Sequence, residues 1–204
     1  ATQVDICNQA LSLLGDAASV TSINPADGSP QAGHCARWYP IALRRLFEEH
    51  AWSWATARDS DLARLTGVES ADLGGYAFAF SLPSECVRIL GVTDPEHFEP
   101  KDYLAMRFDS GPVIATDEER PVLTYVRYID NPAVFPGWFT DALVARLAAY
   151  LVGPLRRSDS STNTASNLLS LYGRLLSEAK TADSQSGTRR RDRYVASQLR
   201  ARRV

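Results

Sequence analysis

Apolar residues recur at spacings of three and four from Ser29 to Asp59, and this stretch constrains the fold more than any other. Ser29 and Pro30 suit the N-cap and the first position of a helix. Residues 30 to 57 would span roughly 40 Å as one helix, and we expect a kink at Pro40, which has no backbone N–H to donate. The apolar stripe consists of Cys35, Trp38, Tyr39, Ala42, Leu43, Leu46, Phe47, His50 and Trp54. We therefore predict a long central helix in a globular domain.

Three more helices follow from the same spacing, over residues 2 to 14, 136 to 153 and 165 to 179. Leu62 and Leu65 fit a further short helical turn. Alternating apolar residues predict strands in the intervening sequence, over residues 76 to 82, 86 to 92, 112 to 116 and 122 to 129, whereas residues 102 to 108 are ambiguous.

The predicted fold class is α+β and mainly helical. We expect an up-down four-helix bundle with a small antiparallel β insertion and a flexible basic C-terminal tail. The predicted domains are a bundle of residues 1–73 and 131–183, an insertion of residues 74–130, and an arginine-rich tail of residues 184–204.

Charge is distributed unevenly along the 204 residues, whose formal net charge is −2. Seven arginines and one aspartate lie between Thr188 and Val204, which gives this segment a net charge of +6. The rest of the chain therefore carries −8. An acidic body with a basic tail is typical of a tail that docks on a negative partner, and a solvated tail is the alternative.

Three cysteines, Cys7, Cys35 and Cys86, lie in apolar patterns without close spacing. Their odd number and the lack of a recognisable signal peptide favour reduced thiols and assembly in a cytoplasm. The most apolar run, residues 142 to 155, is interrupted by Arg146 and is shorter than the ~20 residues that cross a bilayer. We expect a soluble protein with no membrane contact.

Catalytic motifs are not found in the sequence. It has no glycine-rich phosphate loop, no Gly-x-Ser-x-Gly elbow and no His-Glu-x-x-His pair. His34 and Cys35 are adjacent and would point in different directions on a helix, so they do not indicate a metal site. His50 is expected to pack with Trp52 and Trp54. We therefore predict no enzyme activity, no cofactor and no metal.

Four stretches, taken in order, resemble the phage head-to-tail adaptor family, of the tail tubular protein A type found in short-tailed phages. They cover most of residues 5 to 183, and it is their joint order that carries the resemblance, because each alone is a packing pattern. The first stretch is Ile6-Cys7-Asn8-Gln9-Ala10-Leu11 to Leu14-Gly15, and the second consists of Cys35, Tyr39-Pro40, Arg44, Leu46, Trp52-Ser53-Trp54-Ala55 and Arg58. The third runs from Tyr76 to Pro83 and continues with Cys86-Val87-Arg88-Ile89-Leu90. The fourth consists of Val126-Arg127-Tyr128-Ile129-Asp130, Phe139, Ala142-Leu143 to Leu151, and Ala179 to Asp183. Beyond Asp183 the chain matches no pattern of the family.

This resemblance implies a structural virion protein that forms a ring of about twelve copies. Such a ring docks on the portal protein, contacts a tail nozzle or tail tube component below, and lets DNA pass through its channel without sequence-specific binding. The implied location is the head-tail junction of a virion assembled in the bacterial host cytoplasm. The alternative is a small DNA-binding or packaging accessory protein that acts through the basic tail.

The tail supplies the candidate partner-binding residues. Val195 and Leu199 are four residues apart beside Tyr194, so a short amphipathic helix could form on a partner. In a portal–adaptor joint that partner would be an acidic groove on the portal, and DNA phosphate is the competing partner. The candidate residues are Arg189, Arg190, Arg191, Arg193, Tyr194, Leu199, Arg200, Arg202 and Arg203.

Overall fold

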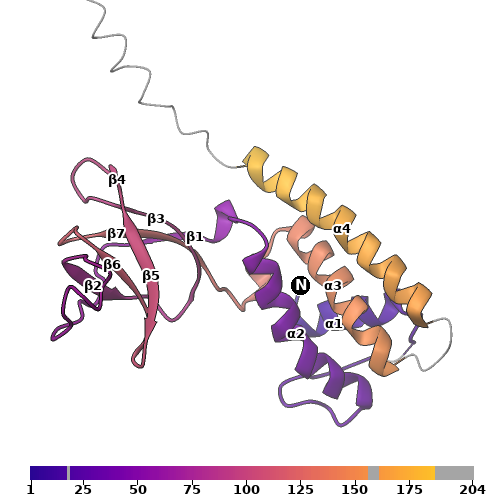
Figure 1. Ribbon diagram of the computed structural model, residues 1–204. Coiled ribbons are helices and arrows are strands. Elements are labelled where there is room, and N and C mark those ends of the chain that lie inside the picture. The colour runs from indigo at the N-terminus through magenta and orange to yellow at the C-terminus, as the bar shows by residue number, and fades with distance from the viewer. Residues whose placement is uncertain (18, 156–160, 187–204) are drawn as a thin grey trace, which may run out of the picture.

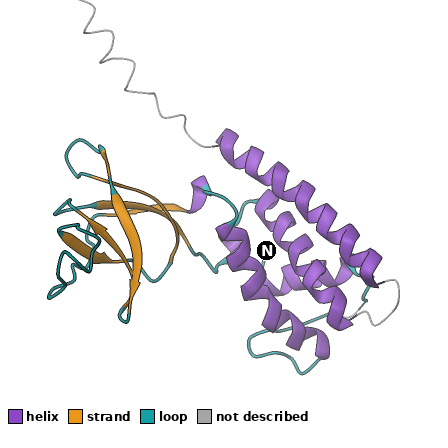
Figure 2. Cartoon of the chain, in the orientation of Figure 1, coloured by secondary structure: helices purple, strands orange, loops and turns teal. Residues whose placement is uncertain are grey.

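Helices and strands are segregated into two regions. The computed structural model describes residues 1–17, 19–155 and 161–186. Four helices pack together on one side of the molecule, and the strands form a separate β region on the other (Figures 1 and 2). The chain passes between the two regions after the second helix and again before the third.

The helical region consists of α1 (Gln3–Leu13), α2 (Pro30–Glu48), α3 (Gly137–Leu155) and α4 (Ser161–Ser186). Local sequence explains where the first two begin. The Thr2 and Asp5 side chains form a reciprocal capping box at the start of α1. The Ser29 hydroxyl caps α2 by accepting a hydrogen bond from the Ala32 N–H at 3.1 Å.

The central element of the helical region is α3, which packs against each of the other three helices. Nine of its residues are buried, from Phe139 to Val152. They join buried residues of α1, α2 and α4 in one hydrophobic core, which also includes Trp52 and, from a strand, Val126. A helix that is buried on most of its surface is suited to the centre of a domain.

Seven strands form two antiparallel sheets in the β region. Their bounds are β1 (Thr56–Asp59), β2 (Phe78–Ser81), β3 (Cys86–Thr93), β4 (Pro100–Lys101), β5 (Tyr103–Phe108), β6 (Gly111–Thr116) and β7 (Val122–Arg127). One sheet has the order β1-β7-β3-β4 and the other the order β2-β6-β5.

The two sheets pack face to face. Phe80 and Ile114 of the three-stranded sheet share a buried cluster with Val92, Leu123 and Tyr125 of the four-stranded sheet. Because successive strand residues point to opposite faces, Ala79 and Ala115 lie on the other face of the three-stranded sheet. There they pack with Leu73 and the loop around it.

The strand β7 connects this sandwich to the helices. Its residues alternate in direction: Leu123 and Tyr125 enter the cluster between the sheets, whereas Val126 enters the core of the helical region. Tyr128, just after the strand, lies 5.6 Å from Phe47 of α2, measured between ring centroids.

The expectation of a mainly helical four-helix bundle with one small β insertion is wrong. Seven strands in two sheets accompany four helices in the described residues, so the fold is mixed α+β. The ambiguous stretch 102–108 contains β5, a full edge strand. The expectation also missed β1. Trp54 continues the helical spacing but lies in a 3-10 turn, Ser53–Ala55, and the chain then becomes extended and pairs with β7 over Thr56–Asp59. The predicted domain division stays a prediction. Strand β1, however, precedes residue 74, the predicted start of the β insertion, and still belongs to the four-stranded sheet.

Element ends also differ from the expectations. The long helix ends at Glu48 rather than near residue 57. It continues through Pro40, which lies on the exposed side of α2. The expected turn at Leu62 and Leu65 is extended, because the Leu65 N–H bonds to the Ala79 carbonyl of β2. Pro154 is inside α3 rather than beyond its end, and α4 begins at Ser161, before the expected start at residue 165.

Candidate functional site

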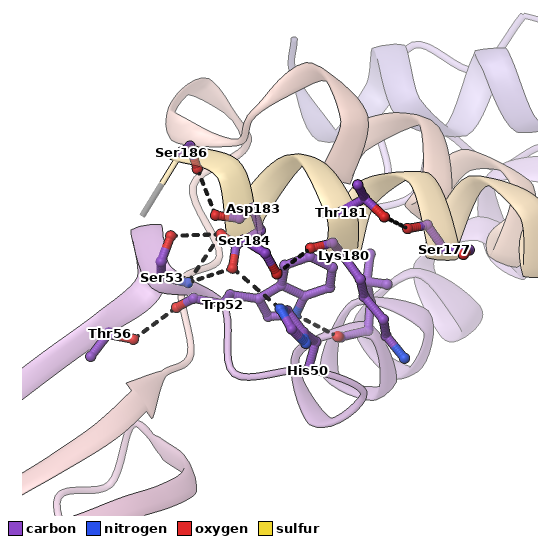
Figure 3. Close-up of polar contacts among 11 residues, drawn as sticks. His50, Trp52, Ser53, Thr56, Ser177, Lys180, Thr181, Asp183, Ser184 and Ser186 are labelled. Atoms are coloured by element: carbon purple, nitrogen blue, oxygen red, sulfur yellow. Dashed lines mark hydrogen bonds and ion pairs between the residues drawn. The ribbon is translucent and has the colours of Figure 1, made fainter. Parts of the chain in front are cut away.

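The predicted partner-binding residues Arg189, Arg190, Arg191, Arg193, Tyr194, Leu199, Arg200, Arg202 and Arg203 all lie outside the described residues. The structure does define where the segment that carries them begins. The last described residue of α4 is Ser186, next to the turn between α2 and β1 (Figure 3). The arginine segment, which is the part of the predicted tail from Thr188 to Val204, therefore follows in sequence from the junction of the helical and β regions.

Asp183 forms the polar centre of this junction. Its carboxylate comes from the last turn of α4 and is only 2% exposed. Oδ1 and Oδ2 accept hydrogen bonds from the Ser53 N–H at 3.0 and 2.9 Å, and Oδ1 also accepts from the Ser53 hydroxyl at 2.8 Å. The His50 Nε2 lies 3.3 Å from Oδ2 (Figure 3). A single buried carboxylate thus fixes the end of α4 to the turn that leads into β1.

The turn itself is held by Trp52, whose side chain is completely buried. Its indole N–H donates to the Leu46 carbonyl at 2.8 Å, and the same carbonyl also accepts the Glu49 N–H at 3.3 Å at the end of α2. Its backbone carbonyl accepts from the Thr56 hydroxyl at 2.9 Å, at the first residue of β1. Trp52 therefore connects the last turn of α2 to the first strand.

Aromatic rings fill the space beneath this turn. Trp52 stacks on Trp138 with ring centroids 5.5 Å apart, and the His50 ring meets the Trp52 ring edge-on at 4.9 Å. Phe139 lies at the centre of the cluster, within about 5 Å of four other rings. These are Phe47, Trp52, Trp54 and Phe135. Such contacts stabilise beyond the apolar area they bury.

The expectation that His50 packs against Trp52 is confirmed, but sequence reasoning missed its acidic partner. Asp183 is 130 residues from Ser53 in the sequence, and no spacing rule connects them. The stretch ending at Asp183 was singled out only because it carries part of the resemblance. A buried aspartate could have been suspected from its place on the apolar stripe of α4, four residues after the buried Ala179.

A second polar element is the loop between β3 and β4. The Asp94 carboxylate, which is 7% exposed as a residue, accepts hydrogen bonds from the backbone N–H groups of Glu96, His97 and Glu99 at 3.0, 2.6 and 2.8 Å. These bonds, the His97 bond above all, lower the Asp94 pKa to about 2, and the Lys101 charge adds to the effect. The loop is thus folded around an ionised carboxylate, whose oxygens are already occupied by donors.

Cys7 and Cys35 meet in the helical core, although their sequence spacing gave no sign of this. Both are completely buried, and their side chains share a hydrogen bond. That bond and burial raise the pKa of the Cys7 thiol above its ordinary value. The pair is thus a packed contact between α1 and α2, and the third cysteine, Cys86, lies apart in β3.

The outer face of α2 combines charge with exposed apolar surface. Pro40, Ile41, Arg44, Arg45 and Glu48 line a shallow groove there, and Ile41 is 42% exposed. Both arginines lie 3.4 Å from the Glu48 carboxylate. Ion pairs this exposed contribute little to stability.

In residues 1–17, 19–155 and 161–186, no three His, Cys, Asp or Glu side chains are grouped so that they could hold a metal ion. Among the helices of this same portion, none has the length and apolar character needed to cross a membrane. The contacts of Asp183 and Trp52 join the helical region to the β region. Comparison with protein-family models gives no match, and no similar sequence is found among curated proteins.

Proposed function

We propose that this chain is the subunit of a head-to-tail adaptor ring in a short-tailed phage. In this proposal it is a structural virion protein that docks on the portal and joins the capsid to the tail, with the DNA channel at the ring centre. The proposal combines the ordered resemblance described above with one structural observation, the junction built on Asp183.

The junction supports the proposal because it brings together stretches that carry the resemblance. The Trp52–Ala55 stretch meets the Ala179–Asp183 stretch through the Asp183 carboxylate, although more than 100 residues separate them. In the β region, the stretch that begins at Cys86 pairs with the one that begins at Val126, as β3 with β7. Because these stretches pack on one another, we expect them to occur together in the members of a family.

An adaptor carries load between two larger assemblies, so its parts need a fixed relative position. Asp183 supplies a part-buried contact at the junction, and Trp52 supplies a buried one. The arginine segment begins at the same junction, so its attachment to a portal would restrain both regions together. The net charge of −8 on the rest of the chain disfavours adhesion to passing DNA.

Electron microscopy of the full-length protein, alone and mixed with the portal protein encoded by the same genome, tests the proposal. We expect cyclic rings of about twelve copies seated on the portal. Failure to bind the portal, combined with binding to bare duplex DNA that weakens steeply with salt, would replace the proposal with the DNA-binding accessory protein.

The arginine segment gives a second arm of this test. Deletion of residues 188–204 should abolish co-sedimentation with the portal at moderate salt, and the triple change R200E/R202E/R203E should weaken it strongly. The matched control is R37E/R88E/R174E, which makes the same charge change at arginines that are exposed on the described surface. Equal loss in both triple variants would show a general charge effect and contradict a docking role for the tail.

A further inference from the structure

The two sheets of the β region end in four strands, and these ends differ in how well they are protected. The outer edge of β2 is covered by residues 63–65, because the Ser81 N–H bonds to the Ala63 carbonyl at 2.9 Å and the Leu65 N–H to the Ala79 carbonyl at 2.8 Å. The end strand β4 has two residues, and β1 has four, including Arg58 and Asp59. By contrast, β5 has six residues, of which only Arg107 is charged.

The register of the hairpin shows which backbone groups of β5 face outward. Arg107 lies opposite Pro112, which has no N–H and whose carbonyl accepts from the Leu82 N–H on the β2 side at 3.0 Å. The pair of Arg107 and Pro112 is therefore not hydrogen-bonded. Because bonded and non-bonded pairs alternate in an antiparallel ladder, the N–H and C=O groups of Tyr103, Ala105 and Arg107 point away from β6. Within the part of the chain that the structure describes, these groups have no backbone partner.

The side chains of β5 leave this edge accessible. Leu104 is 39% exposed, Ala105 and Arg107 are exposed, and Met106 is half-buried. A long, mostly apolar edge of this kind is a template for pairing with another strand, and monomeric proteins usually cover or charge such edges. The β2 edge of the same sheet is covered in this way, whereas the β5 edge is not.

We propose that β5 pairs antiparallel with β5 of a second copy of the chain, about a two-fold axis through Ala105. The three outward residues then each donate and accept one hydrogen bond across the axis. In this register Ala105 faces its own copy, Leu104 faces Met106, and Tyr103 faces Arg107. The second copy is the occupant because β5 complements itself: apolar residues meet on one face, and a cation meets an aromatic ring on the other.

This contact is independent of the proposed adaptor function. A two-fold contact uses the same patch on both copies and closes at two. It therefore describes a pair in solution and is distinct from the head-to-tail contacts that would build a ring. Loss of the pair would leave ring formation on a portal untouched, and failure of the ring would leave the pair untouched.

Sedimentation velocity of the full chain over a range of concentrations tests the pairing. We expect a monomer–dimer equilibrium in the wild type and at least a tenfold weaker dimer in Ala105→Asp, because the two new carboxylates face each other at the axis. The control Ser110→Asp adds the same charge in the turn beyond the paired residues. A wild type that stays monomeric throughout overturns the proposal, as does equal weakening by both variants.

A cross-link supplies a readout that does not depend on the stability of Ala105→Asp. Facing residues of a hydrogen-bonded antiparallel pair have Cα atoms about 5.5 Å apart, within the range that a disulfide spans. Glutathione disulfide should therefore oxidise the two thiols of Ala105→Cys dimers to one interchain disulfide and itself be reduced to two glutathione molecules. The control Ser110→Cys should form few covalent dimers. Equal cross-linking of the two variants would overturn the register.

Discussion

The helical and β regions of this protein are stabilised in different ways. The helices share one core, in which aromatic rings from α2, α3 and the turn after α2 surround Phe139. The β region has two smaller clusters, one between its sheets and one beneath the loop around Leu73. A large common core favours cooperative unfolding, whereas small clusters allow local opening at a lower free energy.

The distribution of tryptophan makes this difference measurable. The four tryptophans of the chain, Trp38, Trp52, Trp54 and Trp138, all belong to the helical core or pack against it. Tryptophan fluorescence therefore reports on the helical region, and amide hydrogen exchange can follow the strands separately. If the Asp183 junction couples the two regions, both probes should report one transition in the wild type.

The largest expected effect comes from Phe139→Ala. Phe139 is completely buried and contacts rings from three segments, so its truncation leaves a cavity that the core cannot fill. We expect a loss of about 3–5 kcal/mol in the free energy of unfolding, measured by urea denaturation with tryptophan fluorescence. The control Leu169→Ala, at a half-exposed site on α4, should stay within about 0.5 kcal/mol of wild type. A loss below about 1 kcal/mol for Phe139→Ala would contradict a single aromatic core.

Leu123→Ala should have a smaller effect, confined mostly to the β region. Leu123 is completely buried between the sheets, in a cluster of only five buried residues. We expect a cost of about 2 kcal/mol, at the low end for such a truncation, seen as faster amide exchange in β3 and β7. The control is Leu90→Ala on the exposed side of β3. Unchanged amide exchange in β3 and β7 would contradict a packed cluster between the two sheets.

Asp183→Ala should separate the two regions. It removes the acceptor of the part-buried hydrogen bonds from the Ser53 N–H and hydroxyl, and a hydrogen bond to a charged group contributes about 1.5–3 kcal/mol. We expect the strands to open at lower urea concentration than the helices, so that the two probes no longer coincide. Asp183→Asn keeps one acceptor oxygen, so its helix and strand transitions should lie closer together than those of Asp183→Ala. Asp141→Ala, at an exposed aspartate of α3, serves as the control and should leave both transitions unchanged.

Sequence patterns predicted the helical region well, because its order depends on short-range spacing. The N-cap at Ser29, the stripe from Cys35 to Phe47 and the apolar run of α3 each lie within one element. An amphipathic helix displays its period directly in the sequence. The strand alternation at Leu123, Tyr125 and Val126 was readable for the same reason.

What failed depends on partners that are far apart in sequence. Strand β1 becomes a strand by pairing with β7, about 70 residues away, and its own four residues have no strand pattern. The hydrogen bonds of Asp183 to Ser53 and the Cys7–Cys35 contact likewise join separate elements. The division of seven strands into two sheets follows from such pairings, so a fold class based on local periodicity overestimated the share of helix.

The smallest expected effect is local and concerns the loop around Asp94 in the β region. Backbone N–H donors lower its pKa from 3.8 to about 2, so the ionised carboxylate stabilises the folded loop. A lowered pKa means that this contribution is complete above pH 3.8 and is lost as the pH falls towards 2. We expect the Asp94 carboxyl carbon to titrate with a midpoint near pH 2 by NMR, and the amide signals of His97 and Glu99 to move with it. In Asp94→Asn those amide signals should not follow such a titration, because the group that changes charge has been removed. A midpoint near 3.8 in the wild type would show that the loop is not organised by the carboxylate.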